Sequence, residues 1–141
     1  FLPYMEELWR YATPGPQGLK EAEHLTLACR SFALSRGCRL REAILPIPRA
    51  GQGARPTPAQ CRSFLEDALD RDCPVAFLNY DEGDVTELDG WHWVPLIAVA
   101  PGDDVPCTVL DEGREKNASF ARWVETTRLG GALAALFPEE D

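Results

Sequence analysis

Two apolar runs on either side of a short turn constrain this chain more than any other feature of its sequence. The first run follows Gly90 and reads Trp-His-Trp-Val-Pro-Leu-Ile-Ala-Val-Ala, and the second reads Cys-Thr-Val-Leu-Asp and ends at Asp111. The segment between them, 101–106, reads Pro-Gly-Asp-Asp-Val-Pro. Apolar runs around a turn rich in Pro, Gly and Asp predict an antiparallel β-hairpin with a longer loop.

The predicted hairpin brings a histidine close to a carboxylate. If Ala100 pairs with Val105, Asp111 lies opposite Val94, one diagonal step from His92 and on the same face of the sheet. A slip of one residue would place Asp111 on the opposite face. A histidine oriented by a carboxylate is half of a hydrolytic site, so His92 and Asp111 are candidate catalytic residues.

Two tryptophans flank this histidine in the first run. Trp91 and Trp93 are therefore candidate binding residues beside the catalytic pair. The alternative interpretation is structural: His92 packs between the two indole rings and bonds a backbone carbonyl.

A nucleophile inside the chain is harder to find. Cys61 is the best candidate, because it lies in the first turns of a helix that Thr57 is expected to cap, where the helix dipole lowers a thiol pKa. The alternative is a buried structural thiol, because Cys61 also belongs to an apolar stripe at helical spacing. The other members of that stripe are Phe64, Leu65, Ala68 and Leu69.

The cysteine pattern bears on compartment and metal binding. Five cysteines without a Cys-x-x-Cys pair predict free thiols in a reducing compartment, which favours a cytoplasmic protein. Only His24 and His92 could join them as ligands and no ligand spacing is present, so we expect no metal and no cofactor. The acidic loop 81–89 lacks the spacing of a calcium site and is expected to be a solvated turn.

Charge and length narrow the class of protein further. A net charge of −9 argues against nucleic acid or an anionic membrane as the main partner. The chain has no apolar run near the roughly 18 residues that span a bilayer, so membrane insertion is not expected. Its 141 residues fit a single domain, 1–141.

The order of the predicted elements favours an α+β fold, because helices come mainly first and strands mainly later. The strand 91–100 is apolar on both faces, which predicts a central strand covered on both sides. Gly37 is a plausible helix C-cap, Thr13–Pro16 stops the first helix, and 112–117 reads as a polar connection. The expected helices are 4–12, 19–35, 57–71 and one after Ser119; the expected strands are 43–47, 75–80 and the hairpin, with 132–137 a strand or a short helix.

The C-terminal half resembles the papain-like cysteine peptidases, and is most similar to the bacterial branch that contains bacteriocin-processing (double-glycine) peptidase-like domains. The resemblance spans roughly 74–137, and the residues that carry it are Pro74-Val75, His92-Trp93-Val94, Asp111 and, in the helix that follows, Trp123. It implies an antiparallel sheet with N-terminal helices packed against it. It also implies that His92 is the general base and Asp111 the residue that orients it.

The sequence departs from this family at three places. Ala98-Val99-Ala100-Pro101 stands where the family often has Gly-Tyr, and Glu112 follows Asp111 where Pro is common. The Gln-and-Cys motif of the family's nucleophile has no counterpart before the first helix. Because Phe1 is not an initiator residue, an upstream segment with the Cys helix is one explanation, and loss of activity is the other.

Two functions from different classes follow. One is a cysteine peptidase-like enzyme that requires a Cys from upstream, so that the present chain would be inactive alone. The other is a non-catalytic module that binds a peptide or protein in the same cleft; a structural partner held by its apolar helices is a third possibility.

Overall fold

The computed structural model describes residues 2–11 and 19–139 of the chain. The chain divides into two compact units. Unit 1 comprises Phe1–Ala43 and Leu136–Asp141, and unit 2 comprises Ile44–Ala135. The strands β1 (Leu40–Ile47) and β6 (Gly131–Pro138) each run from one unit into the other.

Unit 1 contains the helices α1 (Leu2–Tyr11) and α2 (Ala22–Ser35), where helices were predicted. The ring of Tyr11 on α1 meets that of Phe32 on α2 edge to face, with 5.8 Å between centroids. At the end of α2, Gly37 has φ +78° and the Cys38 N–H donates to the Ala33 carbonyl, as in a Schellman motif. The predicted C-cap is confirmed, whereas the predicted stop at Thr13–Pro16 lies outside the described residues.

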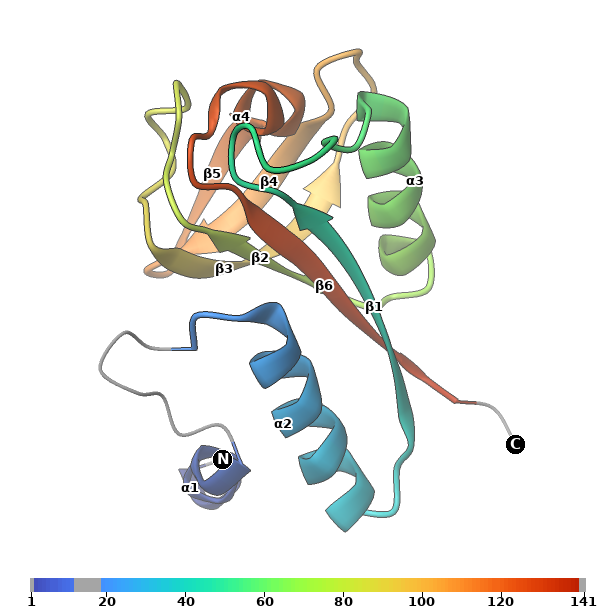
Figure 1. Cartoon of the computed structure of the whole chain (residues 1–141). Helices are drawn as coiled ribbons and strands as arrows, with labels where there is room; N and C mark the ends of the chain where they lie inside the picture. The colour runs from blue at the N-terminus through green and yellow to red at the C-terminus, as the bar shows by residue number, and fades with distance from the viewer. Residues whose placement is uncertain (1, 12–18, 140–141) are drawn as a thin grey trace. The chain divides into compact units, whose positions relative to one another are not determined.

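The strands form one six-stranded sheet in the order β1-β6-β2-β3-β4-β5, so the α+β class is confirmed (Figure 1). The ladders β2–β3, β2–β6, β3–β4 and β4–β5 are antiparallel. The bounds of the remaining strands are Val75–Asn79 for β2, His92–Val99 for β3, Pro106–Asp111 for β4 and Arg114–Ser119 for β5. That the earlier helices α1 and α2 pack against this sheet stays a prediction, because they belong to unit 1.

Helix α3 (Pro58–Leu69) packs on β2 and β3 within unit 2. Its start was predicted correctly: the Thr57 hydroxyl accepts from the Gln60 N–H and the Gln60 side chain accepts from the Thr57 N–H. Its buried stripe, Cys61, Leu65 and Ala68, faces the core. The local cap therefore sets the first turn of the helix, and the apolar spacing sets which face is buried.

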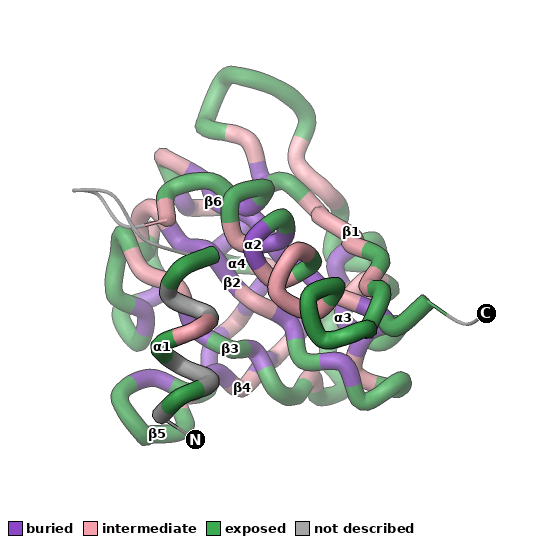
Figure 2. The backbone as a smooth tube through the Cα atoms, turned by 90° about the horizontal axis from the view of Figure 1, so that it is seen from below, coloured by how far each residue is buried: buried purple, intermediate pink, exposed green. Residues whose placement is uncertain are grey.

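Helix α4 (Phe120–Thr126) completes the core of unit 2. Ser119 caps it, as predicted, by accepting from the Arg122 N–H. Its aromatic side chains Phe120 and Trp123 pack on Phe77 of β2, with ring centroids 5.3 and 4.6 Å away. The buried residues follow the inner strands and the helix faces, and the connecting loops are mostly exposed (Figure 2).

Two predictions about the sheet are wrong. The segment predicted as a polar connection is the edge strand β5, whose sequence Arg-Glu-Lys-Asn-Ala-Ser has no apolar alternation by which it could be recognised. Strand β3 is not covered along both faces: Val94 and Leu96 are buried, but Pro95 and Ile97 are exposed. Apolar residues on both faces indicated more burial than this strand has. The segment 132–137, which the sequence left open, is strand.

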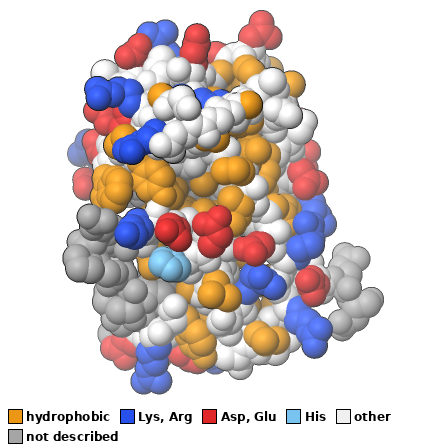
Figure 3. All heavy atoms as spheres, in the orientation of Figure 1, with side chains coloured by type: hydrophobic (Ala, Val, Ile, Leu, Met, Phe, Trp, Pro, Cys, Tyr) orange, Lys and Arg blue, Asp and Glu red, His pale blue; other side chains and the backbone are white. Residues whose placement is uncertain are grey.

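The surface is charged, with both signs mixed. On the face that Figure 3 presents, lysine and arginine side chains are interspersed with aspartate and glutamate. Every helix within 2–11 and 19–139 is too short or too polar to cross a bilayer.

Candidate functional site

The β3–β4 hairpin forms, but its turn does not have the predicted pairing. The Ala100 N–H donates to the Pro106 carbonyl at 2.8 Å, so Ala100 does not pair with Val105. Near the turn, Val99 lies opposite Cys107. The prediction is therefore wrong by one residue at this end of the hairpin.

A β-bulge restores the predicted register before the other end of the hairpin. The pairing shifts by one residue between Leu96 and Ala98, which leaves Ile97 as the extra residue of β3. Beyond the bulge Leu96 lies opposite Val109, the register in which Asp111 falls beside the start of β3. The candidate residues consequently share one face, as predicted, although the assumed turn pairing is wrong.

His92 and Asp111 are in direct contact in the structure. Nε2 of His92 lies 2.9 Å from Oδ1 of Asp111. The side chain of Asp111 is only 5% exposed, whereas that of His92 is 41% exposed. The pair thus joins a covered carboxylate to an imidazole that solvent can reach.

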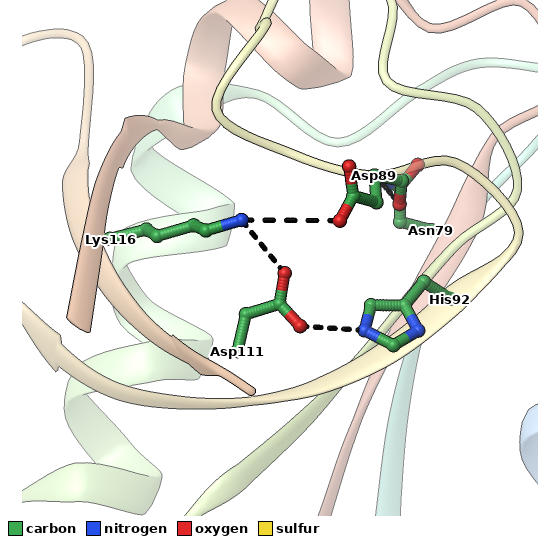
Figure 4. Close-up of polar contacts among 5 residues, drawn as sticks. All are labelled: Asn79, Asp89, His92, Asp111 and Lys116. Carbon is green, nitrogen blue, oxygen red and sulfur yellow. Dashed lines mark hydrogen bonds and ion pairs between the residues drawn. The ribbon is translucent and has the colours of Figure 1, made fainter. Parts of the chain in front are cut away.

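Lys116 of β5 holds the other oxygen of the same carboxylate (Figure 4). Its Nζ lies 2.9 Å from Oδ2 of Asp111 and 3.9 Å from a carboxylate oxygen of Asp89. Figure 4 shows Lys116 and His92 approaching Asp111 from two sides. The side chains of His92 on β3, Asp111 on β4 and Lys116 on β5 therefore form one cluster, with the carboxylate of Asp111 in the middle.

This arrangement fixes the charge of the carboxylate. The hydrogen bond from Lys116, and then that from His92, lower the pKa of Asp111 below its ordinary value. The bond to Asp111 raises the pKa of Lys116 in turn. At neutral pH the carboxylate is ionised, so Nε2 of a neutral His92 donates to it and Nδ1 is left as the proton acceptor.

Asn79 supports the site from β2. It lies directly opposite His92 in the ladder and is 2% exposed. Its amide Nδ2 donates to the Asp89 carbonyl at 2.9 Å, and its Oδ1 accepts from the Trp123 indole at 3.1 Å. These bonds tie the end of β2, which pairs with His92, to the loop before β3 and to helix α4, which limits movement of the backbone that carries His92.

The acidic loop 81–89 is not simply a solvated turn. Oδ1 of Asp81 accepts from the Thr127 hydroxyl and from the backbone N–H groups of Arg128 and Leu129, the latter two at 2.8 Å. Burial alone would raise the pKa of Asp81, but these bonds outweigh it and lower the pKa. Among the described residues no group of three or more His, Cys, Asp or Glu side chains is placed to hold a metal ion.

The surroundings of Cys61 favour the structural interpretation over that of an activated nucleophile. Its side chain is fully buried, and burial raises the pKa of its thiol to about 11 despite a backbone hydrogen bond that lowers it. It lines a cavity of about 280 Å³ together with Pro58 and Val124, and His92 is not among the lining residues. Cys61 is covered with the rest of the buried stripe of α3. The helix dipole therefore does not overcome the increase in thiol pKa that desolvation causes.

Burial disfavours the thiolate form of two other cysteines as well. Burial raises the pKa of Cys107 to about 12, with a smaller contribution from the charge of Asp104. Burial also raises the pKa of Cys29. Of the three thiols in unit 2, Cys61, Cys73 and Cys107, none is hydrogen-bonded to His92.

The two candidate binding tryptophans differ in exposure. Trp91 is 51% exposed, and its ring centroid lies 5.2 Å from that of Tyr80 at a tilt of 39°. Trp93 is half-buried and lies opposite Leu78 in the β2–β3 ladder. Trp91 therefore presents aromatic surface at the residue that precedes His92, and Trp93 is mainly part of the sheet.

Three residues of this region were not predicted: Lys116, Asn79 and Tyr80. Lys116 lies on the strand that the sequence did not reveal, so nothing placed it near Asp111. Asn79 and Tyr80 end the predicted strand 75–80, and a polar residue at the end of an apolar run, beside a histidine strand, is the signal that could have indicated Asn79.

Comparison with known proteins found no matching family model, no matching curated protein and no matching solved structure. The interpretation of the site rests on the geometry described above.

Proposed function

We propose that unit 2 carries the general-base half of a papain-like cysteine peptidase-like site on a fold of that type. His92 is the base and Asp111 orients it. The observation that carries the proposal is the 2.9 Å contact from Nε2 of a half-exposed His92 to a covered Asp111 carboxylate, which leaves Nδ1 to act on a bound group.

In the proposed reaction a thiol gives its proton to Nδ1 of His92 as its sulfur attacks a peptide carbonyl carbon. The tetrahedral intermediate then expels the amine, which takes the proton from His92, and water hydrolyses the thioester. Asp111 stabilises the imidazolium throughout. The buried thiols Cys61 and Cys107 do not fit the nucleophile's role, so the chain alone is proposed not to cleave peptides; a cysteine from another polypeptide segment would complete the site.

The alternative is a non-catalytic module that binds a peptide or protein at the same place. Two observations favour it: none of the thiols of unit 2 is hydrogen-bonded to His92, and half of the side chain of Trp91, the preceding residue, is exposed. In such a module His92 would contribute a hydrogen bond to the ligand and no proton transfer.

Hydrolysis of p-nitrophenyl acetate tests the base directly. We would use the Cys38→Ser protein as background, because Cys38 is the exposed thiol and would itself react. His92→Ala should reduce the protein-dependent rate about tenfold, an order-of-magnitude expectation for loss of a general base acting on an activated ester. His24→Ala is the matched control, since these are the only two histidines.

Equal rates in His92→Ala and the background protein would refute the general-base role and leave the binding module. Loss of the rate in both histidine variants would show that imidazole reacts without any special environment, which also contradicts the proposal.

A further inference from the structure

We propose that Tyr80, Trp91 and Glu82 form a subsite for a basic side chain of a peptide, an arginine or a lysine, beside His92. This inference deepens the proposed function and rests on it for the reaction that would follow binding. The subsite joins an exposed aromatic surface to a carboxylate, which are the two chemical features that attract an organic cation.

The aromatic part is held in place by the backbone. Trp91 precedes His92 directly, and its N–H donates to the Tyr80 carbonyl at 3.2 Å. Its φ of +56° is uncommon for a bulky residue and places it outside the regular strand. The two rings, 5.2 Å apart, are therefore held together at the residue that precedes His92, although half of the Trp91 side chain is exposed.

The carboxylate part comes from Glu82. A Cβ added at Gly90 would lie 2.7 Å from Oε2 of Glu82, so this oxygen sits over the α-carbon that precedes Trp91. A residue larger than glycine at position 90 would displace it. The exposed Glu82 side chain is thus adjacent to the aromatic pair.

Three other acidic residues of the loop 81–89 have partners within the chain, which leaves the carboxylate of Glu82 to interact with a ligand. Asp81 is bonded to the 127–129 segment, Asp84 lies 3.4 Å from Arg122, and Asp89 lies 3.9 Å from Lys116. Glu82, by contrast, has no ion pair with any residue that the structure describes. The loop 81–89 has acidic residues and no lysine or arginine, so its field favours a cationic ligand.

The position of the subsite has a consequence for substrate class. Trp91 and His92 are consecutive residues with α-carbons about 3.8 Å apart, so a peptide held at Trp91 by one side chain has its backbone within a few residues' length of His92. The proposed ligand is therefore a peptide with a basic residue near the carbonyl that reacts.

Binding of two matched peptides tests this subsite. The probes are acetyl-Gly-Arg-Gly-amide and the same peptide with citrulline, which has nearly the shape of arginine but no charge. The indole N–H signals of the ¹⁵N-labelled chain report binding at Trp91. We expect the arginine peptide to bind about tenfold more tightly, the order expected of a cation that meets a half-exposed aromatic face and a nearby carboxylate together.

Three variants define the expected pattern. Trp91→Leu keeps the apolar bulk without the ring, and Glu82→Gln removes only the charge; each should reduce the preference for arginine about three- to tenfold. Asp103→Asn removes a carboxylate at the hairpin turn, at the opposite end of β3 from Trp91, and should leave the preference unchanged. Equal binding of the two peptides, or an equal loss in Asp103→Asn and Glu82→Gln, would overturn the subsite.

One further variant separates the two proposals. His92→Ala should retain the preference for arginine while it loses the ester hydrolysis. If His92→Ala changes neither the preference for arginine nor the rate of ester hydrolysis, the subsite is supported and the general-base role of His92 is refuted. If hydrolysis depends on His92 but arginine and citrulline bind equally, the reverse holds.

Discussion

Asp81 and Asp111 are two carboxylates of unit 2 whose pKa values are both lowered, yet their surroundings differ in kind. Asp81 accepts hydrogen bonds from a threonine hydroxyl and from backbone N–H groups, while burial opposes its ionisation. Asp111 accepts from two side chains, Lys116 and a half-exposed His92. The direction of the pKa shift therefore does not distinguish the structural role of Asp81 from the role proposed for Asp111, whereas the identity and exposure of the partners do.

The largest effect is expected at Asp81. Asp81→Ala leaves the Thr127 hydroxyl and two backbone N–H groups without their acceptor, which should lower the free energy of unfolding by about 3 kcal/mol. Urea denaturation measures this loss. Asp84→Ala in the same loop removes only an exposed pair with Arg122 and should cost less than about 1 kcal/mol. Similar losses in both variants would show that Asp81 does not hold the loop.

A smaller effect, on chemistry and not on stability, is expected at Asp111. In Asp111→Asn the amide can turn its NH₂ group toward His92, which would favour the Nδ1–H tautomer, in which Nδ1 can no longer accept a proton. The ester hydrolysis should fall about tenfold while unfolding changes less than in Asp81→Ala. Long-range ¹⁵N–¹H spectra of the imidazole identify the tautomer. An unchanged Nε2–H form with an unchanged rate would contradict the orienting role.

The smallest effect is expected at Lys116. Because its hydrogen bond is the largest cause that lowers the pKa of Asp111, Lys116→Gln should raise that pKa, as ¹³C titration of the carboxyl carbon would show. Since the folded-state pKa of Asp111 is lowered, its ionised form stabilises the fold above the ordinary value near 3.9, and this contribution is lost as pH falls through the folded-state pKa. In Lys116→Gln the folded-state pKa lies closer to the ordinary value, so the loss should be smaller and should be complete at a higher pH.

Two controls sharpen that titration. The Asp81 carboxyl should titrate as in the unchanged protein, because its partners are elsewhere. Arg114→Gln removes a neighbouring positive charge on the same strand and should move the Asp111 pKa less than Lys116→Gln. If the two variants shifted Asp111 equally, the effect would come from net charge and not from the hydrogen bond.

The sequence predicted the features that depend on local patterns. The capping box at Thr57, the cap at Ser119 and the C-cap at Gly37 are formed by residues a few positions apart, and all three are present. The contact of His92 with Asp111 was predictable because both lie in one hairpin. These features require no knowledge of distant parts of the chain.

What the sequence did not predict depends on tertiary structure. The polar strand β5 exists because it pairs with β4, and its own residues give no strand signal, so Lys116 went unrecognised. The thiol of Cys61 has a raised pKa because the core covers it, whereas a helix start alone favours a lowered one. The bulge at Ile97 likewise leaves no mark in the alternation of β3.

That bulge separates the turn from the site. Side chains alternate between faces, so a one-residue change in pairing near the turn would ordinarily reverse the direction of every side chain along the strand. Here the extra residue Ile97 compensates for the one-residue difference in pairing between the two ends of the hairpin. The register at the His92 end is therefore independent of the register at the turn. Insertions in the loop 100–105 are thereby decoupled from His92 and Asp111, and deletion of Ile97 would make the pairs Leu96–Val109 and Ala98–Thr108 consecutive while His92 keeps its face of the sheet.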